Sequence, residues 1–240
     1  MAPIVLVIDG EIGAGKSTLV GILAEHLTSK YGLNVQTIYE PVKSWLDCGI
    51  LTAFYENKKE MAFPFQIKTF TSRVDAVIEA VKEIPDADIY IAERSIWTDY
   101  LFMLHVKEMG LLDDSTEGTP GEMLFGIYKE IWKHWKDLLP VVPTHHIYLK
   151  PTMITCMDRV TERCRDGEPS GVTLEYQESL RRYHEAYLEG KHPDLVCKFP
   201  EDTNPENVLV IPHGLADADF RGSPDSDDIV TIISEFLKIE

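Results

Sequence analysis

Short apolar runs alternate along the chain with longer segments in which apolar residues recur at helical spacing. Ile4–Ile8 is a nearly continuous run of β-branched residues and leucine, which is typical of a parallel strand covered on both faces. Further runs of this kind occupy Val35–Tyr39, Ile89–Ala92, His146–Leu149 and Val208–Ile211. Segments of helical period lie between them, at Gly15–Ser29, Ala62–Lys82, Gly121–Leu139 and Leu174–Leu188.

This alternation predicts an α/β fold with a five-stranded parallel sheet flanked by helices on both faces, in three layers. Ligands of such sheets bind beyond the carboxyl ends of the strands, so functional residues should follow strands. Loop-like composition is confined to Asp113–Gly121, Asp166–Gly171 and the acidic Gly214–Asp228 segment, which we interpret as a solvated surface excursion. None resembles an interdomain linker, and we expect a single domain over residues 1–240.

The composition narrows the possible partners. Lys and Arg number 23 against 40 Asp and Glu, and the resulting net charge of −17 repels nucleic acids and anionic membranes alike. We therefore expect neither as a partner. The four cysteines form no CxxC pair, and Met1–Asp9 has no basic leader, so we expect reduced thiols and a cytoplasmic or similarly reducing location. An anionic ligand needs a local pocket of backbone N–H groups, cations and metal.

Residues 10–17 supply such a pocket. Their sequence, Gly-Glu-Ile-Gly-Ala-Gly-Lys-Ser, fits GxxxxGK[ST] directly after the first predicted strand and at the start of the first helix. The glycines let N–H groups surround a β-phosphate, Lys16 bridges the β- and γ-phosphates, and Ser17 is placed to ligate Mg²⁺. The predicted site for the nucleoside triphosphate, ATP or another, comprises Gly10, Gly13, Ala14, Gly15, Lys16, Ser17 and Thr18.

Many proteins with this loop are switches rather than kinases. A GTPase needs a guanine-reading NKxD sequence after a strand, and Asn57-Lys58-Lys59-Glu60 is not that sequence and lies between helical segments. The switch interpretation is therefore disfavoured.

Two further strands end in charged residues. Glu40-Pro41 follows the second strand, with Trp45 soon after, and Glu93-Arg94-Ser95 follows the third. Arg94 can hold the Glu40 carboxylate or an acceptor oxygen, and Glu93 can reach the Mg²⁺ shell. A single acidic residue is more often a surface or capping group. Together, at strand ends beside a phosphate loop, these residues predict one cleft.

The motifs taken together resemble those of the deoxyribonucleoside kinase family, which contains deoxycytidine, deoxyguanosine and mitochondrial thymidine kinases. The matching motifs are the phosphate loop, Glu40-Pro41 with Trp45, Tyr55, Phe65-Gln66, Glu93-Arg94-Ser95, the group Arg159, Arg163 and Arg165 with Glu168, and Leu174-Glu175-Tyr176. The resemblance covers residues 1–190 and weakens beyond. It implies a P-loop kinase fold and transfer of the γ-phosphate of ATP or another nucleoside triphosphate, with Mg²⁺, to the 5′-hydroxyl of a deoxyribonucleoside in nucleotide salvage.

The resemblance also implies roles for the acceptor residues. Glu40 corresponds to the base that accepts the 5′-hydroxyl proton, and Gln66 to the amide that pairs with the nucleobase edge. Trp45 and Phe65 resemble the aromatic walls of the base site. Tyr55 and Glu168 resemble the pair that holds the sugar 3′-hydroxyl.

The three arginines resemble the family's lid over the triphosphate, here at about residues 159–170. Arg159 and Arg163 are four residues apart and share one helical face, and Arg165 follows where that helix should end. Together with Lys16 and Arg94 they complete the expected set of catalytic cations. The competing interpretation is a basic helix face that balances acidic neighbours.

Base preference depends on Arg73 and Asp99, which match the deoxycytidine and deoxyguanosine kinase branch. Thymidine-preferring relatives have apolar residues there, so we expect deoxycytidine or purine deoxynucleosides to be favoured over thymidine. Thr69 differs from the small or aliphatic residue that this family has at the corresponding position. Glu201–Asn207 resembles the loop that touches the donor's adenine.

Alternatives remain at this point. A nucleoside monophosphate kinase such as a thymidylate kinase shares the fold, and a catalytically silent nucleotide-binding subunit shares the phosphate loop. Family members usually form homodimers, and the apolar Gly121–Leu139 and Ile96–Met109 segments are candidates for the interface or for ordinary core.

Overall fold

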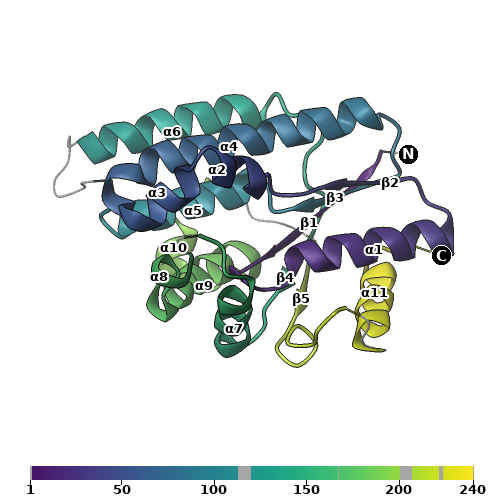
Figure 1. Cartoon of the computed structure of the whole chain (residues 1–240). Helices are drawn as coiled ribbons and strands as arrows, with labels where there is room; N and C mark the ends of the chain where they lie inside the picture. The colour runs from purple at the N-terminus through teal and green to yellow at the C-terminus, as the bar shows by residue number, and fades with distance from the viewer. Residues whose placement is uncertain (1, 113–119, 167, 201–206, 222–223, 240) are drawn as a thin grey trace.

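The computed structural model describes residues 2–112, 120–166, 168–200, 207–221 and 224–239, and it contains a five-stranded sheet in the order β2-β3-β1-β4-β5 (Figure 1). The strand pairs in the described part of the chain are all parallel, with Ile8 beside Glu93 and Gly10 beside Leu149. The strands are β1 (Ile4–Gly10), β2 (Val35–Ile38), β3 (Ile89–Glu93), β4 (His145–Leu149) and β5 (Val208–Ile211). The predicted parallel α/β sheet is confirmed.

The helices differ from the prediction mainly in number. They are α1 (Lys16–Tyr31), α2 (Val42–Asp47), α3 (Ile50–Glu56), α4 (Lys58–Glu83), α5 (Ile96–Glu108), α6 (Pro120–Lys136), α7 (Met153–Arg163), α8 (Glu168–Gly171), α9 (Leu174–Glu189), α10 (Pro193–Val196) and α11 (Pro224–Phe236). The long predicted helices are confirmed. The short helices α2, α3, α8 and α10 were not predicted, because a segment of four to seven residues does not show a helical period. α11 begins inside the segment that we interpreted as a loop, with Pro224 at a first position that needs no N–H donor.

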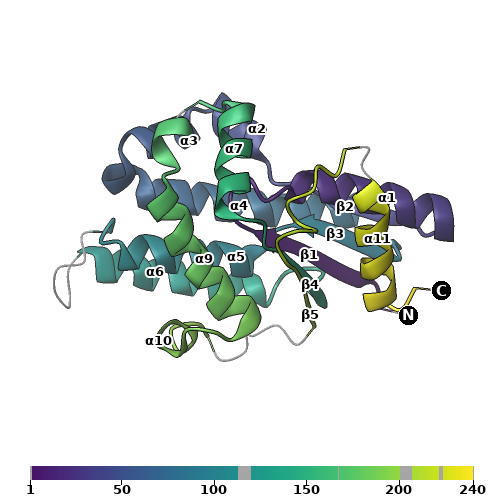
Figure 2. The same ribbon diagram turned by 90° about the horizontal axis from the view of Figure 1, so that it is seen from below.

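The sheet separates two helical layers (Figures 1 and 2). On one face, Leu6 and Ile8 of β1 pack with Leu23 of α1 and Ile233 of α11. The alternate β1 residues, including Val7, face the other side, where Ala80 of α4 belongs to the same cluster. Because both faces are covered, the strands contain no exposed apolar side and read as continuous apolar runs.

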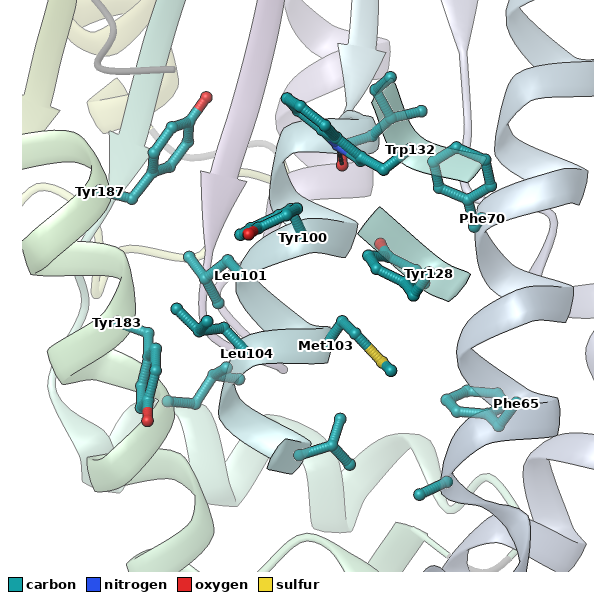
Figure 3. Close-up of a cluster of buried hydrophobic side chains, with 14 of the residues drawn as sticks. Phe65, Phe70, Tyr100, Leu101, Met103, Leu104, Tyr128, Trp132, Tyr183 and Tyr187 are labelled. Atoms are coloured by element: carbon teal, nitrogen blue, oxygen red, sulfur yellow. Dashed lines mark hydrogen bonds between the residues drawn. The ribbon is translucent and has the colours of Figure 1, made fainter. Parts of the chain in front are cut away.

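The largest apolar cluster braces the helices that carry the site. Figure 3 shows Tyr100 and Met103 of α5 between Phe70 of α4 and Tyr187 of α9. The indole N–H of Trp132, on α6, donates to the main-chain oxygen of Ile96 at 2.9 Å. This packing holds α4, α5, α6 and α9 against one another at the carboxyl side of the sheet. Within the described residues, no helix combines the length and apolarity that crossing a bilayer requires.

Candidate functional site: two cavities that meet at the phosphate loop

The phosphate loop connects β1 to α1, as its sequence predicts. Gly13 and Gly15 have φ of 87° and 96°, a backbone conformation that favours glycine. A Cβ on Gly13 would also collide with the main-chain oxygen of Cys156 on α7. Gly15 is the N-cap of α1 and provides no side-chain hydrogen bond. The first N–H groups of the helix are therefore left for an anion.

Lys16 lies buried at the centre of the loop. Its Nζ donates to the main-chain oxygens of Glu11 at 2.9 Å and Gly10 at 3.3 Å. Burial, and after it the charge of Arg94, lowers the pKa of Lys16 to about 8 despite the opposing effects of Glu93 and Glu40. A polyphosphate would restore the missing negative charge, so the loop holds a cation that is electrostatically ready for an anionic ligand.

Ser17 and Glu93 form an oxygen pair beside the loop. The Ser17 hydroxyl donates to Oε1 of Glu93 at 2.9 Å. Two adjacent ligands of an octahedral ion with bonds of about 2.1 Å lie about 3 Å apart, so this pair fits two positions around Mg²⁺. No group of three or more acidic, His or Cys side chains that could hold a metal occurs in the described part of the chain. Mg²⁺ suits such a site because it usually retains waters and phosphate oxygens as its other ligands.

Glu40 follows β2 and is held by two arginines from distant segments. Its Oε1 lies 2.9 Å from an Nη of Arg73 and 3.2 Å from Nε of Arg94. Burial raises the pKa of Glu40, but Arg94, Arg73 and Lys16 outweigh it and bring the pKa to about 2. The carboxylate is therefore ionised at neutral pH, and the predicted pairing of Arg94 with Glu40 is confirmed.

The backbone of Arg94 is strained, since its φ of 63° is uncommon for a residue other than glycine. The guanidinium carbon lies 4.7 Å from the centre of the Phe102 ring, and an Nη lies 3.4 Å from Nε2 of His184. Such strain persists where the surrounding contacts fix the conformation, and it is often found at functional sites.

Arg73 and Asp99 form a buried bidentate pair. Nε of Arg73 donates to Asp99 at 2.7 Å, and an Nη donates to the other carboxylate oxygen at 3.3 Å. The remaining Nη donates to the main-chain oxygen of Glu93 at 3.1 Å. Burial lowers the pKa of Arg73, but Asp99 and Glu40 outweigh burial and raise the pKa above its ordinary value, so the guanidinium stays charged. The pair that the sequence singled out is thus fixed in one orientation between α4 and α5.

One cavity extends from Lys16 between α2, α3, α4, α5 and α8. It brings together every predicted acceptor residue, namely Glu40, Trp45, Tyr55, Phe65, Gln66, Arg73, Arg94, Asp99 and Glu168. Phe54 and Phe102 also line it and were missed, because isolated aromatic residues on helices are more often core. Phe54 stacks on Phe65 with ring centres 4.6 Å apart, and Trp45 meets Phe65 edge to face at 6.0 Å. The cavity is therefore walled by aromatic rings.

A polar group without a partner lies in this cavity. Gln66 is 3 % exposed, and its Oε1 has no hydrogen-bond partner among the described residues. Leaving such a buried acceptor unsatisfied costs about 1–3 kcal/mol. The Thr69 hydroxyl, one turn further along α4, donates to the main-chain oxygen of Gln66 at 3.0 Å and so does not satisfy the side chain. Gln66 is thus available to a donor group of a ligand.

The three arginines of the predicted lid divide into two groups. Arg163 at the end of α7 makes two bonds of 2.7 and 2.8 Å to the Glu168 carboxylate, and Arg165 lies 3.6 Å from it. Arg159 instead donates to four main-chain oxygens, one in Ala14 of the phosphate loop and the others in residues 216–218. Arg159 therefore links the loop to the segment after β5.

That segment corrects the interpretation of Gly214–Asp228 as a solvated excursion. Phe220 is 3 % exposed and packs against Gly15, and Asp217 accepts from the N–H of Thr152 at 2.7 Å. The acidic composition of residues 214–221 concealed these contacts, because apolar residues are few there and several of the contacts are to the backbone. Of the predicted adenine loop Glu201–Asn207, residues 201–206 lie outside the described residues.

A second cavity lies on this side of the phosphate loop. Its lining includes Gly13, Gly15, Lys16, Ser17, Thr18, Glu93, Arg159, Arg163, Arg165, Asp219, Phe220 and Arg221. Five residues line both cavities, namely Gly13, Lys16, Glu93, Arg163 and Arg165. The two cavities therefore meet where Lys16 and the arginines concentrate positive charge in a strongly acidic protein.

Comparison with known proteins agrees with this arrangement. A sequence model described as deoxynucleoside kinase matches residues 6–238. The probable deoxycytidine kinase of fowlpox virus is 30% identical over 182 residues, 75% of this chain and 70% of that protein. The deoxyguanosine kinase of Lactobacillus johnsonii is 32% identical, with 77% and 76% covered, and the deoxycytidine kinase of Rattus norvegicus is 28% identical, with 96% and 89% covered.

The match extends beyond residue 190, where the motifs were too generic to support a resemblance, and it includes the segment that meets the phosphate loop. It also disfavours the thymidylate kinase and silent-subunit interpretations, because the related proteins are kinases of deoxynucleosides. With a phosphate loop at the junction of two cavities and a sequence match over nearly its whole length, this chain is an enzyme of the deoxynucleoside kinase family.

Proposed function

We propose that the enzyme transfers the γ-phosphate of ATP, bound with Mg²⁺, to the 5′-hydroxyl of deoxycytidine or a purine deoxynucleoside, and prefers these to thymidine. The observation that carries the proposal is the meeting of two cavities at Lys16, Glu93 and Arg163, with Glu40 on the acceptor side. A phosphoryl group can pass directly from one ligand to the other only at such a junction.

The donor side has the groups that a triphosphate needs. Gly13, Gly15 and Lys16 of the phosphate loop line the second cavity, and Ser17 and Glu93 would hold Mg²⁺. When bound, Mg²⁺ neutralises charge on the β- and γ-phosphate oxygens. Arg163 and Arg165 line both cavities and are placed to stabilise the negative charge of the phosphoryl group while it moves from donor to acceptor. We propose that residues 159–170 act as a lid in this sense.

The acceptor side has an ionised carboxylate. Glu40 is placed to accept the 5′-hydroxyl proton, and a pKa of about 2 makes it a weak base. A weak base suffices because phosphoryl transfer passes through a loose transition state, which depends on positioning and charge more than on early proton removal. Arg73 and Arg94 hold the carboxylate in place and stabilise it when it is charged.

The nucleobase is proposed to lie between the aromatic walls, with the sugar near Tyr55 and Glu168. The unpaired Oε1 of Gln66 supports a base whose edge offers an N–H donor. Arg73 is held by Asp99, so a charged group occupies space that a 5-methyl group would need. Guanidinium donors also suit the N7 and O6 acceptors of purines. Related proteins named as deoxycytidine, deoxyguanosine and deoxyadenosine kinases agree with this preference.

We also propose an oligomeric state, a domain organisation and a location for the enzyme. Met123 and Ile127 are four residues apart on α6 and are 59% and 48% exposed, which provides an apolar helix face for a homodimer. Residues 1–240 are proposed to act as one domain. The four cysteines, Cys48, Cys156, Cys164 and Cys197, are free thiols and are compatible with the proposed reducing, cytoplasmic location.

The experiment is a substrate panel with MgATP, in which phosphate transfer to deoxycytidine, deoxyadenosine, deoxyguanosine, thymidine and thymidine monophosphate is measured as kcat/KM. Deoxycytidine or a purine deoxynucleoside should give the highest value. Thymidine in first place would refute the base preference. Faster transfer to the monophosphate would refute the alcohol acceptor, and no turnover with any compound would support a silent subunit.

A further inference from the structure

The second residue of the phosphate loop is a carboxylate, which is an unfavourable charge in a loop that binds polyphosphate. Glu11 is fully buried. Its Oε1 accepts from Nε of Arg181 at 2.8 Å and from the hydroxyl of Tyr148 at 2.9 Å, whereas Oε2 has no partner among the described residues. A buried charge of this kind persists only when it is paired, so Arg181 is needed for Glu11 to be tolerated.

Arg181 belongs to one face of α9 that contacts the catalytic junction at consecutive turns. Gln177, Arg181 and His184 are spaced by four and three residues, which places them on the same helical face. Oε1 of Gln177 accepts from the N–H of Ile12 at 3.2 Å, and its Nε2 donates to the oxygen of Ile12 at 2.5 Å. An Nη of Arg181 also donates to the oxygen of Pro151, after β4, at 2.6 Å. Helix α9 therefore forms hydrogen bonds to two successive residues of the phosphate loop, Glu11 and Ile12.

These contacts lie beside the anchor of Lys16, because Nζ of Lys16 donates to the main-chain oxygens of Gly10 and of Glu11, the residue whose side chain Arg181 binds. We infer that Arg181 and Gln177 are positioning residues of the phosphotransfer reaction, which hold Glu11 and Ile12 so that the phosphate loop keeps its shape and carries no uncompensated negative charge toward ATP. The inference rests on the proposed function, since it concerns the donor side of that reaction.

Among the titratable groups around Glu11, Arg181 is the one that compensates its negative charge. The titratable groups that face Glu11 are Arg181 and His184 of α9, Tyr148 of β4 and Cys156 of α7. Burial and Arg94 lower the pKa of His184 to about 4, and burial and Glu11 raise the pKa of Cys156 to about 12. Both are neutral at pH 7, as is Tyr148, whose pKa burial and Glu11 raise. Among these four groups, only Arg181 is a cation at that pH.

The test is a double-mutant cycle on the full-length protein with Arg181→Met, Glu11→Gln and the double variant. KM and kcat are measured with MgATP varied at saturating nucleoside, and with nucleoside varied at saturating MgATP. Arg182→Met is the matched control, because Arg182 is the next residue on α9, its side chain is 56% exposed, and its ion pair with Asp194 is long, at 3.8 Å. Wild-type turnover is established first, since its absence would refute the proposed function rather than this inference.

We expect Arg181→Met to raise the KM for ATP at least about tenfold, the effect of about 1.4 kcal/mol of binding energy, with the KM for nucleoside changed less than about threefold. Adding Glu11→Gln should return the KM for ATP most of the way to the wild-type value, because it removes the unpaired charge. The KM of Arg181→Met for ATP should also rise with pH as Glu11 loses its proton, a dependence that the double variant lacks.

Two outcomes would overturn the inference. One is an ATP KM for Arg181→Met equal to that of the Arg182→Met control, and the other is additive effects in the double variant. A purely structural role for the pair would lower the temperature of unfolding and the concentration of active enzyme without the selective change in ATP KM. If Arg181→Met does not fold, the same cycle with Arg181→Gln decides by the same measurement, because glutamine also removes the positive charge but keeps N–H donors that can bond to neighbouring oxygens.

Discussion

Replacing Glu40 with glutamine tests the proposed proton acceptor with little change of shape. In the wild type, two guanidinium groups lie 2.9 and 3.2 Å from one carboxylate oxygen, and the carboxylate is ionised at neutral pH because these cations bring its pKa to about 2. Glutamine retains an oxygen that can accept from Arg73 and Arg94, but it cannot take up a proton. The substitution therefore separates the positioning of the nucleoside from proton acceptance.

The magnitude follows from the chemistry of the site. General base catalysis typically contributes a factor of about 10² to 10⁴, and a hundredfold loss corresponds to about 2.7 kcal/mol of transition-state stabilisation. Arg73 keeps its bidentate partner Asp99 in the variant, so the free energy of unfolding should fall by no more than about 2 kcal/mol from the two weakened bonds. We expect kcat to fall at least about a hundredfold while nucleoside affinity changes less than about fivefold.

The assay combines steady-state ADP production with calorimetric titration of deoxycytidine and a thermal unfolding curve. Asp47→Asn is the control, because it makes the same carboxylate-to-amide change at a side chain that is 61% exposed and forms a surface ion pair with Lys43. A kcat within threefold of the wild type, with normal nucleoside binding, would show that Glu40 does not accept the proton. A large loss of nucleoside affinity would show instead that its main role is to hold the substrate.

Three further predictions concern the phosphate loop and the dimer. The kcat/KM for MgATP should fall as pH rises through about 8, because the pKa of buried Lys16 is lowered to about 8 and the neutral amine attracts phosphate less; a flat profile to high pH would contradict this. Gly13→Ala should raise the KM for ATP at least about tenfold, since its φ of 87° and the nearby α7 backbone strain any side chain by about 1–3 kcal/mol; unchanged ATP titrations would argue against that loop shape. Ile127→Glu, at an exposed position of α6, should convert the proposed dimer to a monomer in light scattering, with the secondary structure unchanged in circular dichroism.

The sequence was informative wherever the deciding interactions are local. Continuous apolar runs predicted the five strands, since a strand covered on both faces needs apolar residues at every position. The phosphate loop was predicted in full, because its shape depends on glycines and on the strand and helix directly beside it. Glu40 and Glu93 were identified by their positions at strand ends, where a parallel sheet collects its ligands.

Tertiary structure alone decided which distant side chains meet. Arg73 joins Arg94 on the Glu40 carboxylate although 33 positions separate it from Glu40, and the sequence indicated only the Arg94 contact. The same holds for Arg159, whose four main-chain acceptors lie in Ala14 and in residues 216–218, far from it in the sequence. Gln177 and Arg181 carried no sequence signal, since their partners in the phosphate loop lie 165 and 170 residues away. Backbone carbonyls and buried charges find their partners through the packing of helices on the sheet, and the packing depends on the whole chain at once.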